Sequence, residues 1–249
     1  MTKNNLSTYY LLQRLLNPKE VLDARLFEYN QKLKPEVKDF VIKRIKSRLE
    51  LLLEKIDGLE IHDIYLTGST ASYFYHEQSN IDIRVDIRNV SCKHLSKDDE
   101  FLSRFLMSYY SGIFDKHKLM WGTQEVVMTI SSGMHETLPF GVYSVLNDKW
   151  VVEPQKDITK GLNVDALQAE YERRYYGLQN HLIKVKENSD LKTLMGINAL
   201  KKLHKEILAS NNVSVGDYII YKMLNYSGII KELEATYNQA LKKFLSLTD

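Results

Sequence analysis

The sequence predicts an α+β fold in which a small mixed β-sheet lies between N-terminal helices and a C-terminal helical bundle. Three observations predict it. Apolar residues recur at steps of three and four over residues 37–56, which is the spacing of an amphipathic helix. Residues 80–88 alternate strictly between polar and apolar side chains, as in a half-buried strand. From about Val164 to Leu247 the spacing is helical again.

The chain length bounds the number of domains. The 249 residues allow one large domain or two small ones. The mixed pattern gives way to a purely helical one near residues 154–163. We therefore predict a sheet-containing domain with its N-terminal helices over residues 1–160, and a helical domain over residues 161–249.

Each remaining element rests on a local signal. Pro35 suits the first turn of the long helix, and Gly58 suits its end. Asn147-Asp148, between two short apolar runs, indicates a hairpin turn. In chain order, the expected elements are helices within residues 6–57, a strand at 61–66, a short helix at 70–77, a strand at 80–88, a helix at 98–114, a strand at 124–130, a hairpin of 140–146 with 149–153, and C-terminal helices that break near residues 188–190, 211–212 and 227–228.

The composition limits the classes of function. The net charge is +2, so the chain is not a general polycation that binds nucleic acid by charge alone. Cys92 is the single cysteine, which excludes disulfide frameworks and cysteine zinc sites and fits a reducing compartment. The polar start of the chain and the lack of a run of eighteen apolar residues predict a cytoplasmic protein without a membrane span.

The segment Leu66-Thr67-Gly68-Ser69, followed after ten residues by Asn80-Ile81-Asp82-Ile83, carries the functional signal. A glycine lets backbone N–H groups approach a phosphate closely, because it has no side chain to obstruct them. Ser69 can add a hydroxyl donor, and a helix beginning there would point its N-terminus at the same anion. Side chains at i and i+2 of a strand share one face, where oxygen ligands suit magnesium.

This arrangement resembles the DNA polymerase beta-like nucleotidyltransferase superfamily. The signature of that superfamily is a Gly-Ser turn after a strand, roughly ten residues, and two carboxylates one residue apart on a second strand. The resemblance covers about residues 61–90. It implies a nucleoside triphosphate held by Gly68 and Ser69, and two Mg²⁺ ions held by the carboxylates. One ion would activate the attacking hydroxyl, and the other would neutralise charge on the leaving pyrophosphate.

The chain departs from the signature at the first carboxylate position, which is Asn80, whereas the second is Asp82. An amide oxygen can ligate magnesium, but it carries no charge. Three explanations remain open for the asparagine: an engineered replacement of aspartate, a natural enzyme with a modified site, or a catalytically silent relative that binds nucleotide. A second register, with Asp82 first and Arg84 second, is less favourable because it places a cation at a ligand position.

Three further residues complete the candidate site. Arg84 and Asp86 share the strand face of Asp82. We expect Arg84 to pair with Asp82 or with a phosphate, and Asp86 to serve as a more distant metal ligand. The resemblance implies a third carboxylate on a neighbouring strand. Glu125, at the start of the 124–130 strand, is the favoured candidate, and Glu153, at the end of the hairpin, is the alternative.

The leading functional hypothesis is a magnesium-dependent nucleotidyltransferase. It would move a nucleoside monophosphate from a nucleoside triphosphate to an acceptor hydroxyl and release pyrophosphate, with Asn80, Asp82 and Glu125 as catalytic and metal-binding residues. The acceptor is an RNA end, a protein or a small molecule, because the superfamily includes all of these. The alternative is a nucleotide-binding regulatory or interaction module without turnover. A third hypothesis is a structural protein in which the strand pattern is coincidental.

Overall fold

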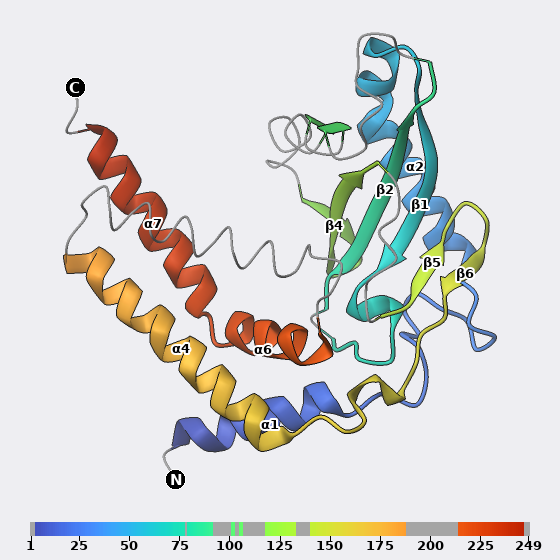
Figure 1. The fold of residues 1–249 in the computed structure, drawn as a ribbon. Coiled ribbons are helices and arrows are strands. Elements are labelled where there is room, and N and C mark those ends of the chain that lie inside the picture. Colours follow the sequence, from blue (N-terminus) through green and yellow to red (C-terminus); the bar gives the residue numbers. More distant parts are fainter. Residues whose placement is uncertain are drawn as a thin grey trace. The chain divides into compact units, whose positions relative to one another are not determined.

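The protein has an α+β fold, as the sequence predicts, with a six-stranded mixed sheet and helices toward both ends of the chain (Figure 1). The computed structural model describes residues 3–77, 79–91, 101–102, 105–106, 118–132, 140–187 and 214–246, with side chains described from residue 10 to residue 242. Two compact units make up the chain. The sheet unit is Pro18–Asp157, and the helical unit combines Met1–Asn17 with Ile158–Asp249.

The sheet places the two halves of the sequence motif on neighbouring strands. Its strand order is β3-β4-β2-β1-β5-β6, in which β2 and β4 run parallel and every other pairing is antiparallel. The strands span Leu59–Thr67 (β1), Ile81–Asn89 (β2), Leu119–Trp121 (β3), Gln124–Ser131 (β4), Val142–Ser144 (β5) and Lys149–Val152 (β6). The predicted strands and hairpin are confirmed, whereas the three-residue β3 has too short a pattern to be recognised.

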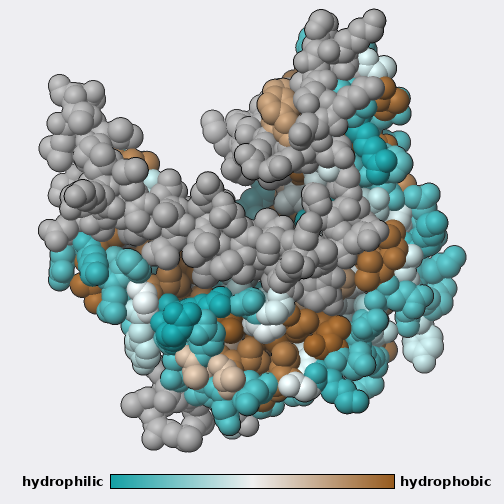
Figure 2. Space-filling model, viewed as in Figure 1, coloured by the Kyte–Doolittle hydropathy of each residue, from teal (hydrophilic) through white to brown (hydrophobic). Residues whose placement is uncertain are grey.

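The core of the sheet unit lies between the sheet and α2 (Pro35–Lys55), which runs along one side of it beside β1 (Figure 1). The predicted apolar stripe is buried, and Pro35 occupies the first turn as expected. The core side of α2 is Val37, Val41, Ile45, Leu49 and Leu52, and the buried apolar positions of β2 are Ile81, Ile83, Val85 and Ile87. The visible surface at the β5–β6 edge of the sheet is largely hydrophilic (Figure 2).

Two helix predictions were wrong. Residues 17–34, which lie within the region predicted to be helical, are not helical. Pro18 ends the first helix, because it lacks an N–H and disfavours helical backbone at Asn17. The short helix expected at 70–77 is a 3₁₀ turn, η1 (Ser69–Ala71). Of the helix expected at 98–114, most residues lie outside the part of the chain that the structure describes, as do the breaks at 188–190 and 211–212.

The helical unit consists of α1 (Lys3–Leu16), α4 (Val164–Glu187), α6 (Val215–Tyr226) and α7 (Ile229–Ser246). The break predicted near Ser227-Gly228 separates α6 from α7. Leu12 and Leu15 of α1 belong to the same buried cluster as Tyr171 and Leu178 of α4. The chain therefore divides close to residue 160, but α1 joins the helical unit rather than the sheet. No described helix is long and apolar enough to cross a membrane.

Glu170 of α4 lies at the centre of a small network of ion pairs in the helical unit. Its carboxylate accepts hydrogen bonds from Arg173 and Arg174, and Arg174 also binds Asp217 of α6 at 2.7 Å. Hydrogen bonds from the two arginines lower the pKa of Glu170 to about 2. A depressed pKa adds stability above the ordinary value of about 4.5, and this stability is lost as the pH falls toward 2.

We expect Glu170→Gln to lower the free energy of unfolding by about 1 kcal/mol at pH 7, because the Glu170 side chain is 31% exposed and solvent partly screens the pairs. The difference between variant and parent should shrink as the pH falls from 4.5 to 2. Urea unfolding followed by circular dichroism at pH 7 and pH 3 measures it. An equal difference at both pH values would contradict the assigned pKa.

Candidate functional site

The turn after β1 brings Gly68 into direct contact with Asp82. Thr67 pairs with Asp82 in the β1–β2 register, so the end of one strand lies beside the start of the other. Gly68 has φ +72°, a backbone conformation that favours glycine. A Cβ added at Gly68 would collide with Asp82 Oδ2 and would lie 3.1 Å from its Cγ. The two halves of the motif therefore meet through the aspartate side chain.

Ser69 is held inside the turn. It is 3% exposed, and its Oγ donates to Ser79 Oγ at 3.1 Å. Its carbonyl accepts from Ser72 Oγ at 2.7 Å, which helps to end η1 after one turn. A three-residue 3₁₀ turn lacks the aligned dipoles of a helix, so the expected helix N-terminus does not contribute at this site. To donate to a phosphate, the Ser69 hydroxyl would have to leave Ser79.

The segment that leads into Asn80 is fixed by side chains that carried no signal in the sequence. Ser79 Oγ accepts from the backbone N–H of His76 at 3.0 Å. The buried Gln124, at the start of β4, donates from Nε2 to the carbonyl of Ser79 at 3.0 Å. These bonds tie the segment to both the 3₁₀ turn and the neighbouring strand, so they position Asn80 and Asp82.

Arg25 fixes the same segment from the other end. Its guanidinium donates to the carbonyls of Glu77 at 2.8 Å and His76 at 3.1 Å. The buried carboxylate of Asp23 holds Arg25 through Nε at 2.8 Å and Nη2 at 2.6 Å, and hydrogen bonding to Asp23 raises the pKa of Arg25. A buried aspartate paired in this way orients the arginine, so residues far apart in sequence support the turn.

Asn80 and Asp82 lie at the accessible end of β2. Asn80 is exposed and immediately precedes the strand, while Asp82 is half-buried. In the parallel β2–β4 register, Asp82 pairs with Val127 and Ile81 with Val126. Glu125 therefore lies on the face of Asp82, one strand over and two residues back, level with Asn80. The register brings the asparagine and two carboxylates to one end of one face.

The sheet order distinguishes the two candidates for a third carboxylate. Glu125 begins a strand that neighbours β2, whereas Glu153 follows β6, which two strands separate from β2. Glu125 Oε2 accepts from Lys118 Nζ at 2.8 Å, and the lysine side chain is 70% exposed. An ion pair this exposed is worth little and is readily exchanged for another cation. The geometry favours Glu125.

Arg84 and Asp86 continue the same face away from the turn. Arg84 is half-buried between Tyr65 of β1 and Thr129 of β4, and burial lowers its pKa. Asp86 is fully buried and accepts from Arg88 Nη2 at 3.2 Å. Four residues along a strand separate its Cα from that of Asp82 by roughly 13 Å. Asp86 is therefore not brought to the turn, whereas Arg84 is the nearest cation on this strand face.

The oxygen donors at the turn suit a magnesium ion in their chemistry. Among the residues that the structure describes, no three His, Cys, Asp or Glu side chains are grouped closely enough to hold a metal. Asn80 leaves two acids near the turn, Asp82 and Glu125. Magnesium is commonly bound by one or two carboxylates together with substrate phosphates and water. Magnesium at Asp82 and Glu125 would therefore need further oxygen ligands, from water or from a bound anion.

Comparison of the chain with known protein families, characterised proteins and solved structures gives no match.

Proposed function

We propose that the chain is a nucleotidyltransferase-type protein that binds a nucleoside triphosphate with magnesium at the Gly68 turn. The observation that supports it is the contact between Gly68 and the Asp82 carboxylate. That contact places a backbone turn suited to phosphate and an oxygen ligand suited to magnesium beside each other. If the two halves of the motif occurred in this sheet by coincidence, nothing would require the Asp82 side chain to face Gly68.

Each residue of the site has a part in this proposal. Backbone N–H groups of the Gly68 turn would donate to phosphate oxygens, and Arg84 would supply positive charge along the same strand face. Asp82 and Glu125, with the amide oxygen of Asn80, would hold the ion. Magnesium bound there would offset phosphate charge and favour ionisation of the attacking hydroxyl. In the reaction, an acceptor oxygen bonds to the α-phosphorus, the bond to pyrophosphate breaks, and the hydroxyl proton is released.

One observation favours a second candidate, a nucleotide-binding module without turnover. Asn80 stands at the exposed end of the face, where it supplies an oxygen without a negative charge. With asparagine at position 80, the protein contributes two carboxylates, Asp82 and Glu125, where the superfamily signature has three, so it attracts a second magnesium ion less strongly. The pair of ions that the resemblance implies stays a prediction, as do the acceptor and the cytoplasmic location.

We expect Asp82→Asn to weaken magnesium-dependent nucleotide binding at least tenfold, because it removes the carboxylate that contacts the turn. Glu125→Gln should weaken it about fivefold, since Lys118 already offsets part of its charge. Titration of a fluorescent nucleoside triphosphate, with magnesium or with a chelator, measures both effects.

Glu153→Gln is the matched control, because it removes the same charge at the other edge of the sheet. It should leave the nucleotide affinity unchanged. Equal effects of Glu125→Gln and Glu153→Gln would remove Glu125 from the site. A parent chain that binds no nucleotide with magnesium would overturn the proposed function and leave the structural hypothesis.

A further inference from the structure

Arg84 of β2 is a half-buried cation without a partner. It makes no ion pair or hydrogen bond with any other residue in the part of the chain that the structure describes, whereas Arg88 on the same strand face pairs with Asp86 at 3.2 Å. Arg25 and Arg174 are half-buried too, and each is held by a carboxylate. An unpaired charge that is partly removed from water costs free energy, so such a group is suited to an ion of opposite charge.

The surroundings of Arg84 suit a phosphate group. The pairing of Arg84 with Asp82 that the sequence allowed is not formed. Thr129 of β4 is level with Arg84 and exposed, and its hydroxyl makes only a long bond of 3.4 Å to the carbonyl of Ile83. Asp86, two residues farther from the turn, is fully buried, so the accessible part of this strand face ends at Arg84. A guanidinium beside a hydroxyl provides several donors for the oxygens of one phosphate.

The order of groups along β1 and β2 indicates which phosphate Arg84 would meet. Asp82 is level with Thr67, and Arg84 is level with Tyr65. Because Gly68 follows Thr67, Asp82 lies between the turn and Arg84, which are roughly 10 Å apart along the strands. With pyrophosphate at the turn and magnesium at Asp82, Arg84 lies on the opposite side of the reacting phosphorus. The attacking and leaving oxygens are roughly in line across that phosphorus, so this is the side of the acceptor.

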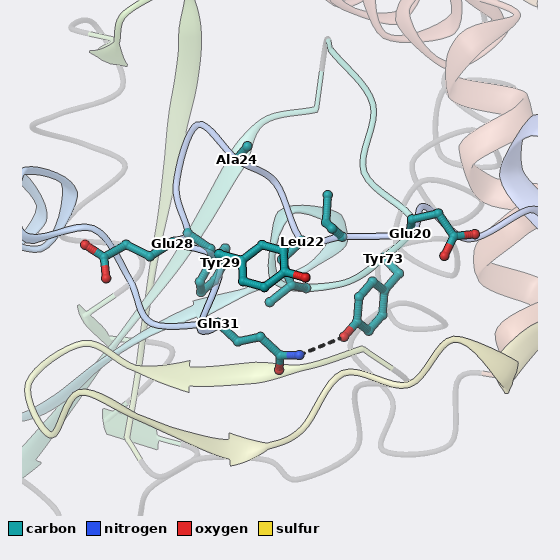
Figure 3. Close-up of a pocket in the computed structure, with 9 residues that line it drawn as sticks. Glu20, Leu22, Ala24, Glu28, Tyr29, Gln31 and Tyr73 are labelled. Atoms are coloured by element: carbon teal, nitrogen blue, oxygen red, sulfur yellow. Dashed lines mark hydrogen bonds between the residues drawn. The ribbon is translucent and has the colours of Figure 1, made fainter.

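The cavity shown in Figure 3 is a poorer place for an anion. It has a volume of about 370 Å³ and is lined by residues between 20 and 31 and by Tyr73. Two carboxylates, Glu20 and Glu28, stand at its outer ends, and its described lining residues include no lysine or arginine. Lys156 approaches Tyr73 from outside, but its ammonium already donates to the carbonyl of Glu20 at 2.7 Å. An anionic acceptor therefore has a better complement at Arg84.

We propose that the acceptor carries a phosphate group beside its reacting hydroxyl, and that Arg84 with Thr129 binds this phosphate. The 3′ end of a nucleic acid strand and a small phosphorylated polyol both have this chemistry. The acceptor oxygen bonds to the α-phosphorus, pyrophosphate leaves toward the Gly68 turn, and the hydroxyl proton is released to solvent. Magnesium at Asp82 would offset the repulsion between the two phosphate groups. This inference rests on the proposed nucleotide site and names the class of substrate that reacts there.

Binding of a short fluorescent oligoribonucleotide tests the proposal without turnover. Anisotropy measures its affinity in the presence of magnesium and an α,β-methylene nucleoside triphosphate. A matched oligomer has a neutral methylphosphonate in place of its last phosphodiester. We expect the parent to bind the natural oligomer about tenfold more tightly, because the matched one lacks a charge-assisted bond to arginine. Arg84→Gln should bind both oligomers equally, and Arg84→Lys should keep part of the difference.

Glycerol 3-phosphate, compared with glycerol by calorimetry under the same conditions, tests the small-molecule source. If the acceptor is small, the parent should bind glycerol 3-phosphate and Arg84→Gln should bind it about tenfold more weakly. Arg44→Gln is the matched control, because Arg44 is an exposed arginine of α2, which packs on the other face of the sheet. It should leave every preference of the parent unchanged.

Two outcomes would overturn the proposal. The first is a loss of triphosphate affinity in Arg84→Gln as large as in Asp82→Asn, which would assign Arg84 to the nucleotide itself; we expect a change of about twofold or less. The second is a parent that binds the triphosphate with magnesium but neither distinguishes the two oligomers nor binds glycerol 3-phosphate. That result would leave the proposed function intact, whereas a parent without magnesium-dependent nucleotide binding would overturn both.

Discussion

Replacing Asn80 with aspartate is expected to raise magnesium-dependent nucleotidyl transfer roughly 100-fold or more. Asn80 is level with Glu125 and two residues before Asp82, at the exposed end of one sheet face. An aspartate there would add a negative charge at the end of the face that carries Asp82 and Glu125. Because hard cations prefer anionic oxygen, the added carboxylate should hold magnesium more tightly, and a magnesium ion bound there would offset the negative charge on the departing pyrophosphate.

Pyrophosphate release from each of the four nucleoside triphosphates, at several magnesium concentrations, measures the change. The magnesium dependence of nucleotide affinity is a second readout that does not need turnover. Asn163→Asp is the matched control, because Asn163 caps α4 through a bond to the N–H of Ala166, and aspartate caps equally well. It adds the same charge in the helical unit and should change neither readout.

The outcomes separate the hypotheses. Turnover by Asn80→Asp, with little by the parent, would identify an enzyme weakened by its asparagine. Tight binding without turnover in both proteins would support the nucleotide-binding module. If magnesium promoted nucleotide binding in neither protein, both proposals for the Gly68 turn would fail.

The strands of the site were predictable because their signals are local. The polar–apolar alternation in residues 80–88 indicates a strand with one buried face, and a glycine before a serine indicates a turn. The structure adds the register, which pairs Thr67 with Asp82 and puts Glu125 on the same face. Register depends on how strands pair across the sheet, and the chain spacing between the motif halves constrains it only loosely.

The missed features depend on contacts between distant residues. Arg25 and Gln124 support the site by donating to backbone carbonyls, and any residue type offers a carbonyl. Helical spacing in α1 reveals an apolar face but not its partner, so the packing of Leu12 in the helical unit could not be read from it. At residues 70–77, Ser72 Oγ accepts from the N–H of Phe74, which competes with continued helix.

Gly68→Ala should destabilise the sheet unit by about 3 kcal/mol, and it is the substitution from which we expect the largest loss of stability. Two physical effects add. The backbone of Gly68, with φ +72° and ψ −158°, lies in a region used almost only by glycine and costs a residue with a Cβ about 1–3 kcal/mol, and the new methyl group collides with Asp82 Oδ2. To relieve the collision, Asp82 must rotate away from the turn. Nucleotide binding should therefore fall at least as far as in Asp82→Asn.

Gly122→Ala separates the two effects. Gly122 has φ +58° in the β3–β4 turn, but a Cβ there meets nothing within 4 Å. It should lose about 1–2 kcal/mol from backbone strain alone. The two tryptophans, Trp121 and Trp150, both lie in the sheet unit, so fluorescence during urea unfolding reports on that unit.

The double variant Gly68→Ala with Asp82→Ala tests the contact itself. Removing the carboxylate takes away Oδ2 and Cγ but leaves the Cβ of residue 82 at 3.2 Å, a tight distance that a small shift relieves. The double variant should therefore be more stable than Gly68→Ala alone. Equal losses in Gly68→Ala and Gly122→Ala, with no recovery in the double variant, would mean that Asp82 does not face the turn. The phosphate site and its metal ligand would then have no shared geometry.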